Sequence, residues 1–222
     1  MSSPDAIINE FSFQEKLSPA QMDAAWANGW RHFGSYFFRY SVIGNGADAK
    51  HVLPLRIRLA DFQASTSQRR VWRRNRDLEV QIHDARIDDE KTALFDRHKI
   101  RFSDHVPDSL VSFLGEEPRH TPCCTKEICL YRDHLLIAVT FWDIGDAATS
   151  GIYALFEPTE SRRSLGVYLI LLSIHFSIQQ QKNYYYIGYA HHEPSHYDYK
   201  KRFHALEYYD WNGAWLPFTK TP

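Results

Sequence analysis

The chain has 222 residues, a formal net charge of −1 and 24% charged residues, which excludes a disordered tail protein and a generally basic nucleic-acid coat. Aromatic residues make up 15% of the chain, and Tyr and Trp commonly line grooves that hold bases or peptides. The first residues lack the basic start and the apolar run of a signal peptide, and polar residues interrupt the best apolar stretch, Leu165 to Ile178. The three cysteines are odd in number and closely grouped. We therefore expect a cytoplasmic protein without a disulfide framework.

Hydrophobic periodicity divides the N-terminal half into short elements. It predicts a short helix at Met22–Trp30 and an extended aromatic segment at Tyr36–Tyr40. The alternation through Leu53–Leu59 indicates a half-buried strand. Helical patterns follow at Lys91–Phe102 and at Asp108–Leu114.

A dense arginine cluster follows the predicted strand. Ser65 or Ser67 can cap a helix start, and helical spacing then places four arginines in two stacked rows: Arg69, Arg70, Arg73 and Arg74. Guanidinium groups in rows suit phosphate oxygens, which they bind bidentately. The alternative is a solvated or salt-bridged helix face, but acidic residues come only at the end of the cluster. The pattern favours a polyanionic partner, most commonly nucleic acid.

The C-terminal half alternates strands with one long helix. A hairpin is predicted from Glu127–Tyr131 and His134–Trp142, then a strand at Gly151–Glu157, a helix at Leu165–Lys182 and a strand at Tyr184–Tyr189. A last hairpin is predicted about an Asn-Gly pair. This order is typical of an α+β fold with a GNAT-like (N-acetyltransferase-like) mixed sheet and flanking helices. We predict that domain at residues 63–222 with a smaller N-terminal region at 1–62, or one continuous unit.

The loop before the long helix resembles the donor-binding loop of acyl-CoA transferases, which reads Gln/Arg-x-x-Gly-x-Gly/Ala. Small residues there leave backbone N–H groups free to bind a pyrophosphate at the helix N-terminus. Arg163 and Gly166 fit the pattern, but Tyr168 stands where a small residue is needed. We expect the phenol to obstruct a pyrophosphate, so the GNAT-like fold is predicted without the usual acyl-CoA donor.

A series of short motifs resembles the aminoacyl-tRNA–protein transferases, which comprise arginyl-tRNA–protein transferases and the related bacterial leucyl-tRNA–protein transferases. The motifs run in family order from about Gly29 to Trp215. The matching stretches are Gly29-Trp30-Arg31-His32-Phe33-Gly34, Leu55-Arg56-Ile57, Ser65-x-Ser67-Gln68-Arg69-Arg70, Arg74-Asn75, Leu114, Phe156-Glu157-Pro158, Arg163-Ser164-Leu165-Gly166-x-Tyr168, Tyr185-Tyr186-x-Gly188-Tyr189 and Tyr199-Lys200-x-x-Phe203. The resemblance implies a GNAT-like catalytic half, an aminoacyl-tRNA donor and transfer to the α-amine of a protein with an acidic N-terminal residue.

Such a reaction needs little from the protein, because the aminoacyl ester is already activated. The protein aligns the amine with the ester, helps the amine lose a proton and stabilises the oxyanion. Backbone donors at Leu165 and Gly166 suit the oxyanion or the terminal adenosine. Glu157 is a candidate base or cation-binding group, with a helix-capping or salt-bridged carboxylate as the alternative, and Lys200 is a candidate partner for the acidic side chain of the acceptor. Tyr189 is expected at a strand end that faces the donor loop, which makes it the third candidate catalytic residue, in contact with the substrate.

The expected donor site therefore combines the arginine rows with the loop before the long helix. Its loop members are Arg163, Ser164, Leu165, Gly166 and Tyr168. Family members usually carry a cysteine cluster before the Leu-Arg strand, but the stretch from Tyr40 to Leu53 has none, and the three cysteines lie elsewhere. We therefore predict no metal cluster and no cofactor.

The identity of the transferred amino acid stays open at this level. The Trp-Arg-His-Phe-Gly and Ser-Gln-Arg-Arg stretches are nearer to the arginyl members, so arginine is the first hypothesis and leucine the alternative. Two other readings remain: a peptide aminoacyl transferase of natural-product assembly, and a tRNA-binding module without catalysis. The expected partners are aminoacyl-tRNA and proteins with an acidic N-terminus, without a membrane.

Overall fold

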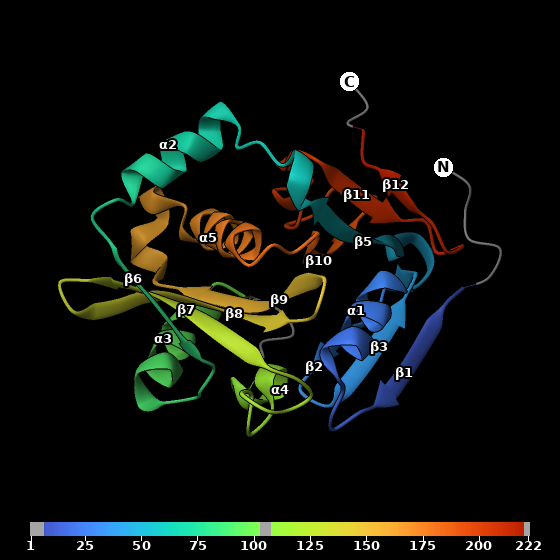
Figure 1. Ribbon diagram of the computed structural model, residues 1–222, viewed down its shortest axis with the longest axis horizontal. Helices are drawn as coiled ribbons and strands as arrows, with labels where there is room; N and C mark the ends of the chain where they lie inside the picture. Colours follow the sequence, from blue (N-terminus) through green and yellow to red (C-terminus); the bar gives the residue numbers. More distant parts are fainter. Residues whose placement is uncertain (1–6, 103–107, 220–222) are drawn as a thin grey trace.

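The computed structural model describes residues 7–102 and 108–219, which form one mixed sheet with helices on both faces and a smaller sheet beside it (Figure 1). The strands are β1 (Asn9–Phe13), β2 (Arg31–Phe33), β3 (Tyr36–Tyr40), β4 (Val42–Ile43), β5 (Lys50–Arg58), β6 (Glu79–Asp84), β7 (Thr125–Arg132), β8 (Leu135–Ile144), β9 (Ala148–Phe156), β10 (Tyr184–His191), β11 (Leu206–Tyr209) and β12 (Trp215–Pro217). The helices are α1 (Pro19–Ala27), α2 (Thr66–Arg74), α3 (Asp89–Lys99), α4 (Val111–Leu114) and α5 (Leu165–Gln179), with 3₁₀ turns η1 (Gly46–Asp48), η2 (Leu59–Asp61), η3 (Pro158–Arg163) and η4 (Lys200–Arg202). The predicted α+β class is confirmed.

Within the described residues the large sheet has nine strands. Its order is β12-β11-β5-β10-β9-β8-β7-β6, and β4 pairs with the first two residues of β5, Lys50 and His51. The small sheet has the order β1-β3-β2. β10 pairs with β9 in parallel, and α5 connects these two strands. The order strand, strand, strand, turn, helix, strand that the sequence predicted is present as β7, β8, β9, η3, α5 and β10.

The expected boundary at residue 62 separates strands that share one sheet. β5 precedes this boundary, yet it pairs with β10 along one edge and with β11 along the other. The residues of the N-terminal region therefore contribute a strand to the interior of the sheet that the C-terminal half completes.

The helices form two layers. In Figure 1, α2 and α5 lie on one face of the large sheet, and α3 and α4 lie on the other. α5 buries nine of its fifteen residues, including Tyr168 and Leu172, which pack with Trp142 of β8. Both faces of the sheet carry apolar clusters, one with α2 and α5 and the other with α3 and α4, and such burial is the main stabilising term of a fold. Among the described residues, no helix has the length and apolar character that crossing a bilayer requires.

Some elements lie outside what the hydrophobic pattern predicted. β1, β2 and β6 had no predicted counterpart, and β6 is an edge strand in which Ile82 is exposed. No residue of β1 or β6 is buried, so these strands lack the apolar alternation that marks a half-buried strand. The β7–β8 hairpin turns at Asp133 and His134, with φ of 50° and 65°, one residue beyond the predicted Arg132-Asp133 turn.

α2 forms as the sequence predicted, and its cap is Ser65. The Ser65 hydroxyl accepts from the backbone N–H of Gln68, and the Gln68 side chain accepts from the backbone N–H of Ser65, which makes a capping box. Val71 and Trp72 turn toward α5, where Trp72 meets Tyr168 edge-on with ring centroids 5.5 Å apart. The arginines occupy the opposite face.

An ionic clamp joins the end of α2 to the start of α5. Arg163 donates to both carboxylate oxygens of Asp77, at 2.9 and 2.7 Å, and to Glu160 at 2.9 Å. Arg132 donates to the other oxygen of Glu160. The hydrogen bond from Arg163 lowers the pKa of Asp77. This clamp fixes the arginine face of α2 relative to the first turn of α5.

We expect Arg163→Met to lower the free energy of unfolding by about 1 to 2 kcal/mol, because it removes charge-assisted bonds that are partly exposed. Asp77 has a lowered pKa in the folded state, so its contribution is present above its unfolded pKa and is lost as pH falls below about 4. Urea unfolding between pH 3 and 7 measures both effects. The matched control is Arg162→Met, an exposed neighbour. Equal stability of the two variants would contradict the clamp.

Candidate active site

β9 and β10 separate after a short parallel contact. They pair at three positions, Ala148–Ser150 with Tyr184–Tyr186, and then β9 continues beside β8 while β10 continues beside β5. The register of β10 against β5 shifts between Tyr186 and Gly188, and Gly188 has a φ of +93°. A gap therefore opens between two central strands, and their facing backbone groups need other partners.

Arg31 of β2 fills one side of this gap. Its guanidinium group donates to the hydroxyl of Ser150 and to the carbonyl of Gly151, the residues at which β9 leaves β10. Loss of solvation lowers the pKa of Arg31, but a guanidinium group remains charged at any ordinary pH. The β9 side of the gap is thus lined by a cation.

Lys200 of η4 fills the other side. Its Nζ donates to the carbonyl of Tyr189 at 2.9 Å and lies 4.8 Å from the ring centre of Tyr197. Loss of solvation, together with the nearby charge of Arg31, lowers the pKa of Lys200 to about 7. Lys200 therefore changes its charge near neutral pH.

The two cations converge above Gly188. A Cβ atom on Gly188 would lie 3.2 Å from Nζ of Lys200 and 3.7 Å from a terminal guanidinium nitrogen of Arg31. Among residues 7–102 and 108–219, neither Arg31 nor Lys200 has a carboxylate within ion-pair distance. Asp143 is committed elsewhere, because it accepts from His32 at 2.7 Å and from Thr125 at 2.6 Å.

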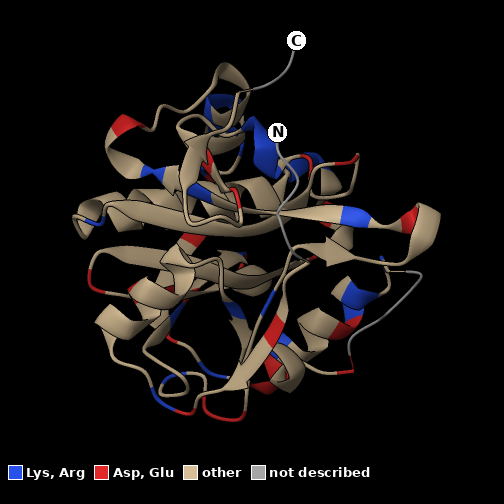
Figure 2. Cartoon of the chain, turned by 90° about the vertical axis from the view of Figure 1, so that its right-hand side faces the viewer, with Lys and Arg blue, Asp and Glu red and all other residues tan. Residues whose placement is uncertain are grey.

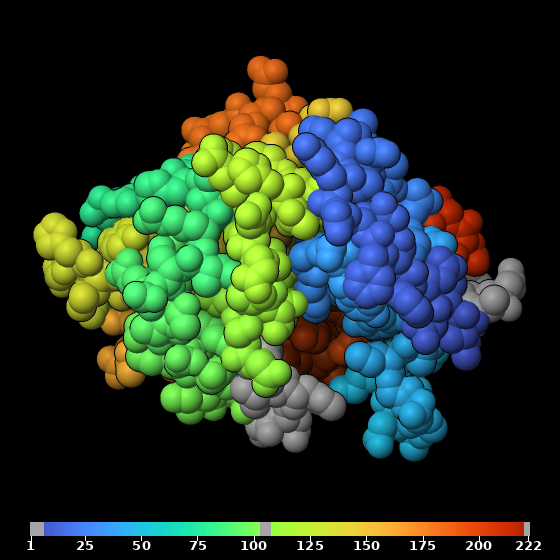
Figure 3. Space-filling view, turned by 90° about the horizontal axis from the view of Figure 1, so that it is seen from below, coloured from blue at the N-terminus to red at the C-terminus, as the bar shows by residue number. Residues whose placement is uncertain are grey.

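Aromatic side chains surround the two cations. Tyr197 lies close enough to Tyr40 and Tyr153 to raise the pKa of each, together with burial. In the described part of the chain the buried hydroxyl of Tyr153 has no hydrogen-bond partner. Figure 3 shows a hollow in this face of the molecule, between the N-terminal strands (blue) and the segment near α4 (yellow-green), with the C-terminal part of the chain (red) in its floor. Arg31, Lys200 and these tyrosines form one cluster of side chains, which we take as the candidate cleft.

The first turn of α5 presents free amides beyond the end of β9, the strand that carries Ser150 and Gly151. Ser164 has a φ of +56°, and its carbonyl accepts from the N–H groups of Val167 and Tyr168. The amides of Leu165 and Gly166 have no backbone partner within the described residues. A Cβ on Gly166 would lie 3.2 Å from the ring of Phe156, so a larger residue there must displace that ring. These two amides can receive negative charge.

Two donor-loop predictions are wrong in their geometry. Tyr168 does not lie over the amides of the loop: it is 4% exposed and packs in the core against Trp72, so its phenol is not the group that would block a pyrophosphate. Arg163 is held by Asp77 and Glu160, so its guanidinium is not free to bind a phosphate. Both residues join α2 to α5 instead.

Glu157 is already bound by its neighbours. One of its oxygens accepts from Arg97 at 2.7 Å, and the other accepts from the Thr159 hydroxyl at 3.2 Å. Burial opposes the charged form, but these bonds prevail and lower the pKa of Glu157. This is the capped and salt-bridged carboxylate of the alternative reading, and it is a weak base.

Tyr189 does not face the loop before α5. Its hydroxyl donates to the carbonyl of Gly29 at 2.6 Å, and its ring packs edge-on against Tyr40 and Phe38 of the small sheet. Burial raises its pKa well above the ordinary value. Tyr189 therefore fixes the small sheet against β10, and through it the strand that carries Arg31.

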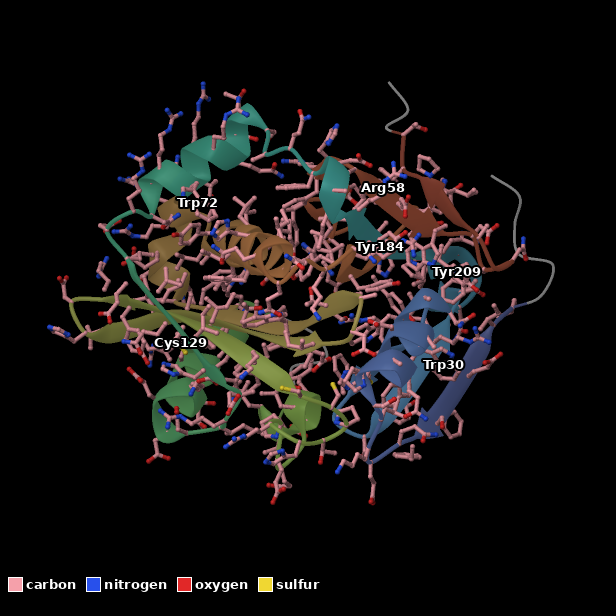
Figure 4. All side chains as sticks on the ribbon, in the orientation of Figure 1. Trp30, Arg58, Trp72, Cys129, Tyr184 and Tyr209 are labelled. Atoms are coloured by element: carbon pink, nitrogen blue, oxygen red, sulfur yellow. The ribbon has the colours of Figure 1, made fainter. Side chains whose placement is uncertain are left out.

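The arginine face of α2 is exposed. Arg69 and Arg74 donate to backbone carbonyls of Ala64 and Arg162, whereas Arg70 and Arg73 form no ion pair with any described residue. In Figure 4 the side chains of α2 extend their nitrogen tips away from the sheet, while Trp72 lies toward α5. Figure 2 shows Lys and Arg positions gathered at the top of the molecule, the level at which α2 lies in Figure 1.

Arg31 belongs to the motif at Gly29–Gly34, but no binding or catalytic role for it was predicted from the sequence. The sequence signal that could have indicated a site is a charged residue among aromatic ones, since Arg31 follows Trp30 and opens the short strand β2. Cys124 is exposed, and burial raises the pKa of the other two thiols, that of Cys129 to about 12. These buried thiols are neutral core groups.

Comparisons with known proteins agree with the motifs. The family "Arginine-tRNA-protein transferase, C terminus" matches residues 88–210. The chain is 33% identical to the aspartate/glutamate leucyltransferase of Hahella chejuensis over 72% of this chain and 68% of that protein. It is 30% identical to the aspartate/glutamate leucyltransferase of Stenotrophomonas maltophilia, covering 82% of this chain and 74% of that protein.

Solved structures were compared as well. The C-terminal domain of a putative lysylphosphatidylglycerol synthetase from Agrobacterium fabrum is 17% identical, with a TM-score of 0.46 over 63% of this chain and 46% of that chain. A GCN5-related N-acetyltransferase from Kribbella flavida is 13% identical, with a TM-score of 0.38 over 66% of this chain and 49% of that chain. The family match and the sequence relatives carry the assignment: the chain belongs to the aminoacyl-tRNA–protein transferase family.

Proposed function

We propose that this protein transfers leucine from leucyl-tRNA to the α-amine of proteins that begin with Asp or Glu. The family match supports an aminoacyl-tRNA donor, and the names of the relatives support leucine and acidic acceptors. The first hypothesis from sequence was arginine; the relatives favour the leucyl alternative. The observation in the molecule that carries the proposal is the cleft floor of Arg31 and Lys200, two cations without an ion-pair partner among the described residues.

The exposed face of α2 is suited to the tRNA. Arg70 and Arg73 stand one helical turn apart and form no ion pair with described residues, so both are free to bind phosphate oxygens. The clamp of Arg163 with Asp77 and Glu160 holds this face at a fixed position relative to α5. A tRNA that contacts α2 through its backbone would therefore present its 3′ end in a defined orientation.

The chemistry at the cleft follows from positioning. The amides of Leu165 and Gly166 would stabilise the oxyanion formed when the amine attacks the ester carbonyl. A free N-terminal α-amine has an ordinary pKa of about 7.7 to 8.0, so a large share of it is neutral near pH 8 and no strong base is needed. For this reason the engagement of Glu157 with Arg97 does not oppose the proposal.

Transfer of labelled leucine and labelled arginine from their cognate tRNAs to an Asp-initiated peptide tests the donor. We expect leucine to be transferred at least roughly tenfold better, as the names of the relatives suggest, because a site that accepts leucine would have to desolvate the guanidinium group of arginine. Acetylated peptide is the control, since it lacks a free amine. Preferred transfer of arginine would restore the first hypothesis, and binding of tRNA without any transfer would leave a tRNA-binding module.

The arginine face is tested by the double variant Arg70→Ala, Arg73→Ala. Phosphate contacts dominate tRNA affinity and release counterions, so we expect KM for leucyl-tRNA to rise severalfold and the salt dependence to lose about two units of slope. The fold should persist, because both side chains are exposed. The matched control is Arg86→Ala, an exposed arginine before α3 on the other face of the sheet. An unchanged slope would make α2 a solvated face.

Glu157→Gln separates a structural carboxylate from a catalytic one. We expect the transfer rate to stay within about threefold of the parent, while the free energy of unfolding falls by about 1 kcal/mol as the bond from Arg97 loses its charge. Single-turnover transfer and urea unfolding measure the two effects. A loss of rate of two orders of magnitude or more, with tRNA binding intact, would instead make Glu157 the base.

A further inference from the structure

We propose that Arg31 and Lys200 form the subsite that binds the carboxylate side chain of the acceptor's first residue, with Arg31 as a specificity-determining residue. This inference rests on the proposed function, which supplies an acceptor with an acidic N-terminus. It assigns that preference to two side chains from distant parts of the sequence, β2 and η4.

Arg31 and Lys200 are cations without an anionic partner among the described residues. Partly buried cations are ordinarily paired with carboxylates, because desolvation without a partner is unfavourable. Within the described residues Arg31 and Lys200 bind neutral oxygens, those of Ser150, Gly151 and Tyr189. An anionic ligand would supply the missing charge, so the site favours an anion over a neutral group of the same shape.

Arg31 and Lys200 both keep N–H donors that no described residue uses. A guanidinium group has five N–H donors and an ammonium group has three. The bonds to Ser150 and Gly151 leave donors on Arg31, and the bond to Tyr189 leaves donors on Lys200. Both groups converge over Gly188, because the absence of a side chain there allows them to approach the backbone and each other. A carboxylate placed there could accept from both cations at once.

Both cations can be reached from solvent. Arg31 and Lys200 both keep some exposed surface although loss of solvation lowers the pKa of each. Groups at the floor of a cleft combine these two properties. Figure 3 shows the hollow beside the blue N-terminal segments, the part of the chain that includes β2. An extended N-terminus, which is narrow and begins with the residue to be read, can enter such a cleft.

The site also couples acceptor binding to a proton. Lys200 is half charged near pH 7 in the free protein, and a carboxylate favours its charged form, so binding above pH 7 takes up a proton. The groups that face Lys200 are Arg31 from β2, Tyr189 from β10 and Tyr197 from the segment before η4. Arg31 stays charged, and burial raises the pKa of Tyr189, so neither changes charge between pH 7 and 9.

The test is direct binding of two peptides that differ only in Asp or Asn at the first position, measured by calorimetry with the full chain. We expect the parent to bind the Asp peptide at least about tenfold more tightly, because the neutral amide leaves the cations unpaired. Lys200→Met and Arg31→Gln should each reduce this preference to about threefold or less. The matched control is Lys201→Met, whose ammonium group binds Asp198 at 2.8 Å and should keep the preference.

A pH series adds an arm that is independent of lost packing. The preference of the parent for the Asp over the Asn peptide should fall at least about threefold from pH 7 to 9, and more proton should be taken up with the Asp peptide than with the Asn peptide at pH 8, since the α-amine titrates equally in both. Lys200→Arg stays charged, so it should keep the Asp preference and lose the pH dependence. This variant also guards against misfolding of Lys200→Met or Arg31→Gln, which thermal unfolding monitors.

The outcomes separate the two proposals. Selective binding of the Asp peptide without leucine transfer would overturn the proposed function and leave the carboxylate subsite standing. Leucine transfer with an unchanged Asp preference in Lys200→Met and Arg31→Gln would overturn the subsite alone. A raised KM for leucyl-tRNA in these variants, with the peptide preference intact, would assign the two cations to a tRNA phosphate and overturn the subsite as well.

Discussion

The candidate site depends on the parting of β9 and β10. Two neighbouring strands that stop pairing leave backbone carbonyls inside a sheet, where an unpaired polar group is destabilising. This chain satisfies the carbonyls of Gly151 and Tyr189 with side chains, and both side chains are cations. The structural need for donors therefore places positive charge at the point where the sheet is open to ligands. Stability and ligand binding draw on the same two groups.

The position of α2 decides which of its faces a ligand can reach. The helix turns Val71 and Trp72 toward α5 and its arginines toward solvent, so packing alone decides which face is available to a polyanion. The clamp at Arg163 adds direction, since it joins the last turn of α2 to the segment that begins α5. A flexible arginine helix would bind RNA as well in total charge, but it would not orient the bound end toward a cleft.

Sequence reasoning succeeded where the signal was local. The cap of α2 at Ser65, the long helix α5 and the strands β7 to β10 follow from capping chemistry and periodicity within one segment. It failed where the outcome depended on distant partners. Arg163 fits a donor motif, yet Asp77 and Glu160 hold it, and Tyr168 was expected to obstruct a ligand but packs against Trp72. No pattern around Arg31 indicates that it reaches β9.

The placement of β5 has a consequence for how the chain acquires its fold. β5 lies at residues 50–58, but both of its long edges are paired by strands from the last part of the chain, β10 and β11. Such pairings have high contact order, and closing the long loop that precedes them is entropically unfavourable and slow. During synthesis β5 emerges long before its partners, with apolar residues and strand edges exposed. Late folding of this kind makes the early chain dependent on protection from aggregation until its final fifth has left the ribosome.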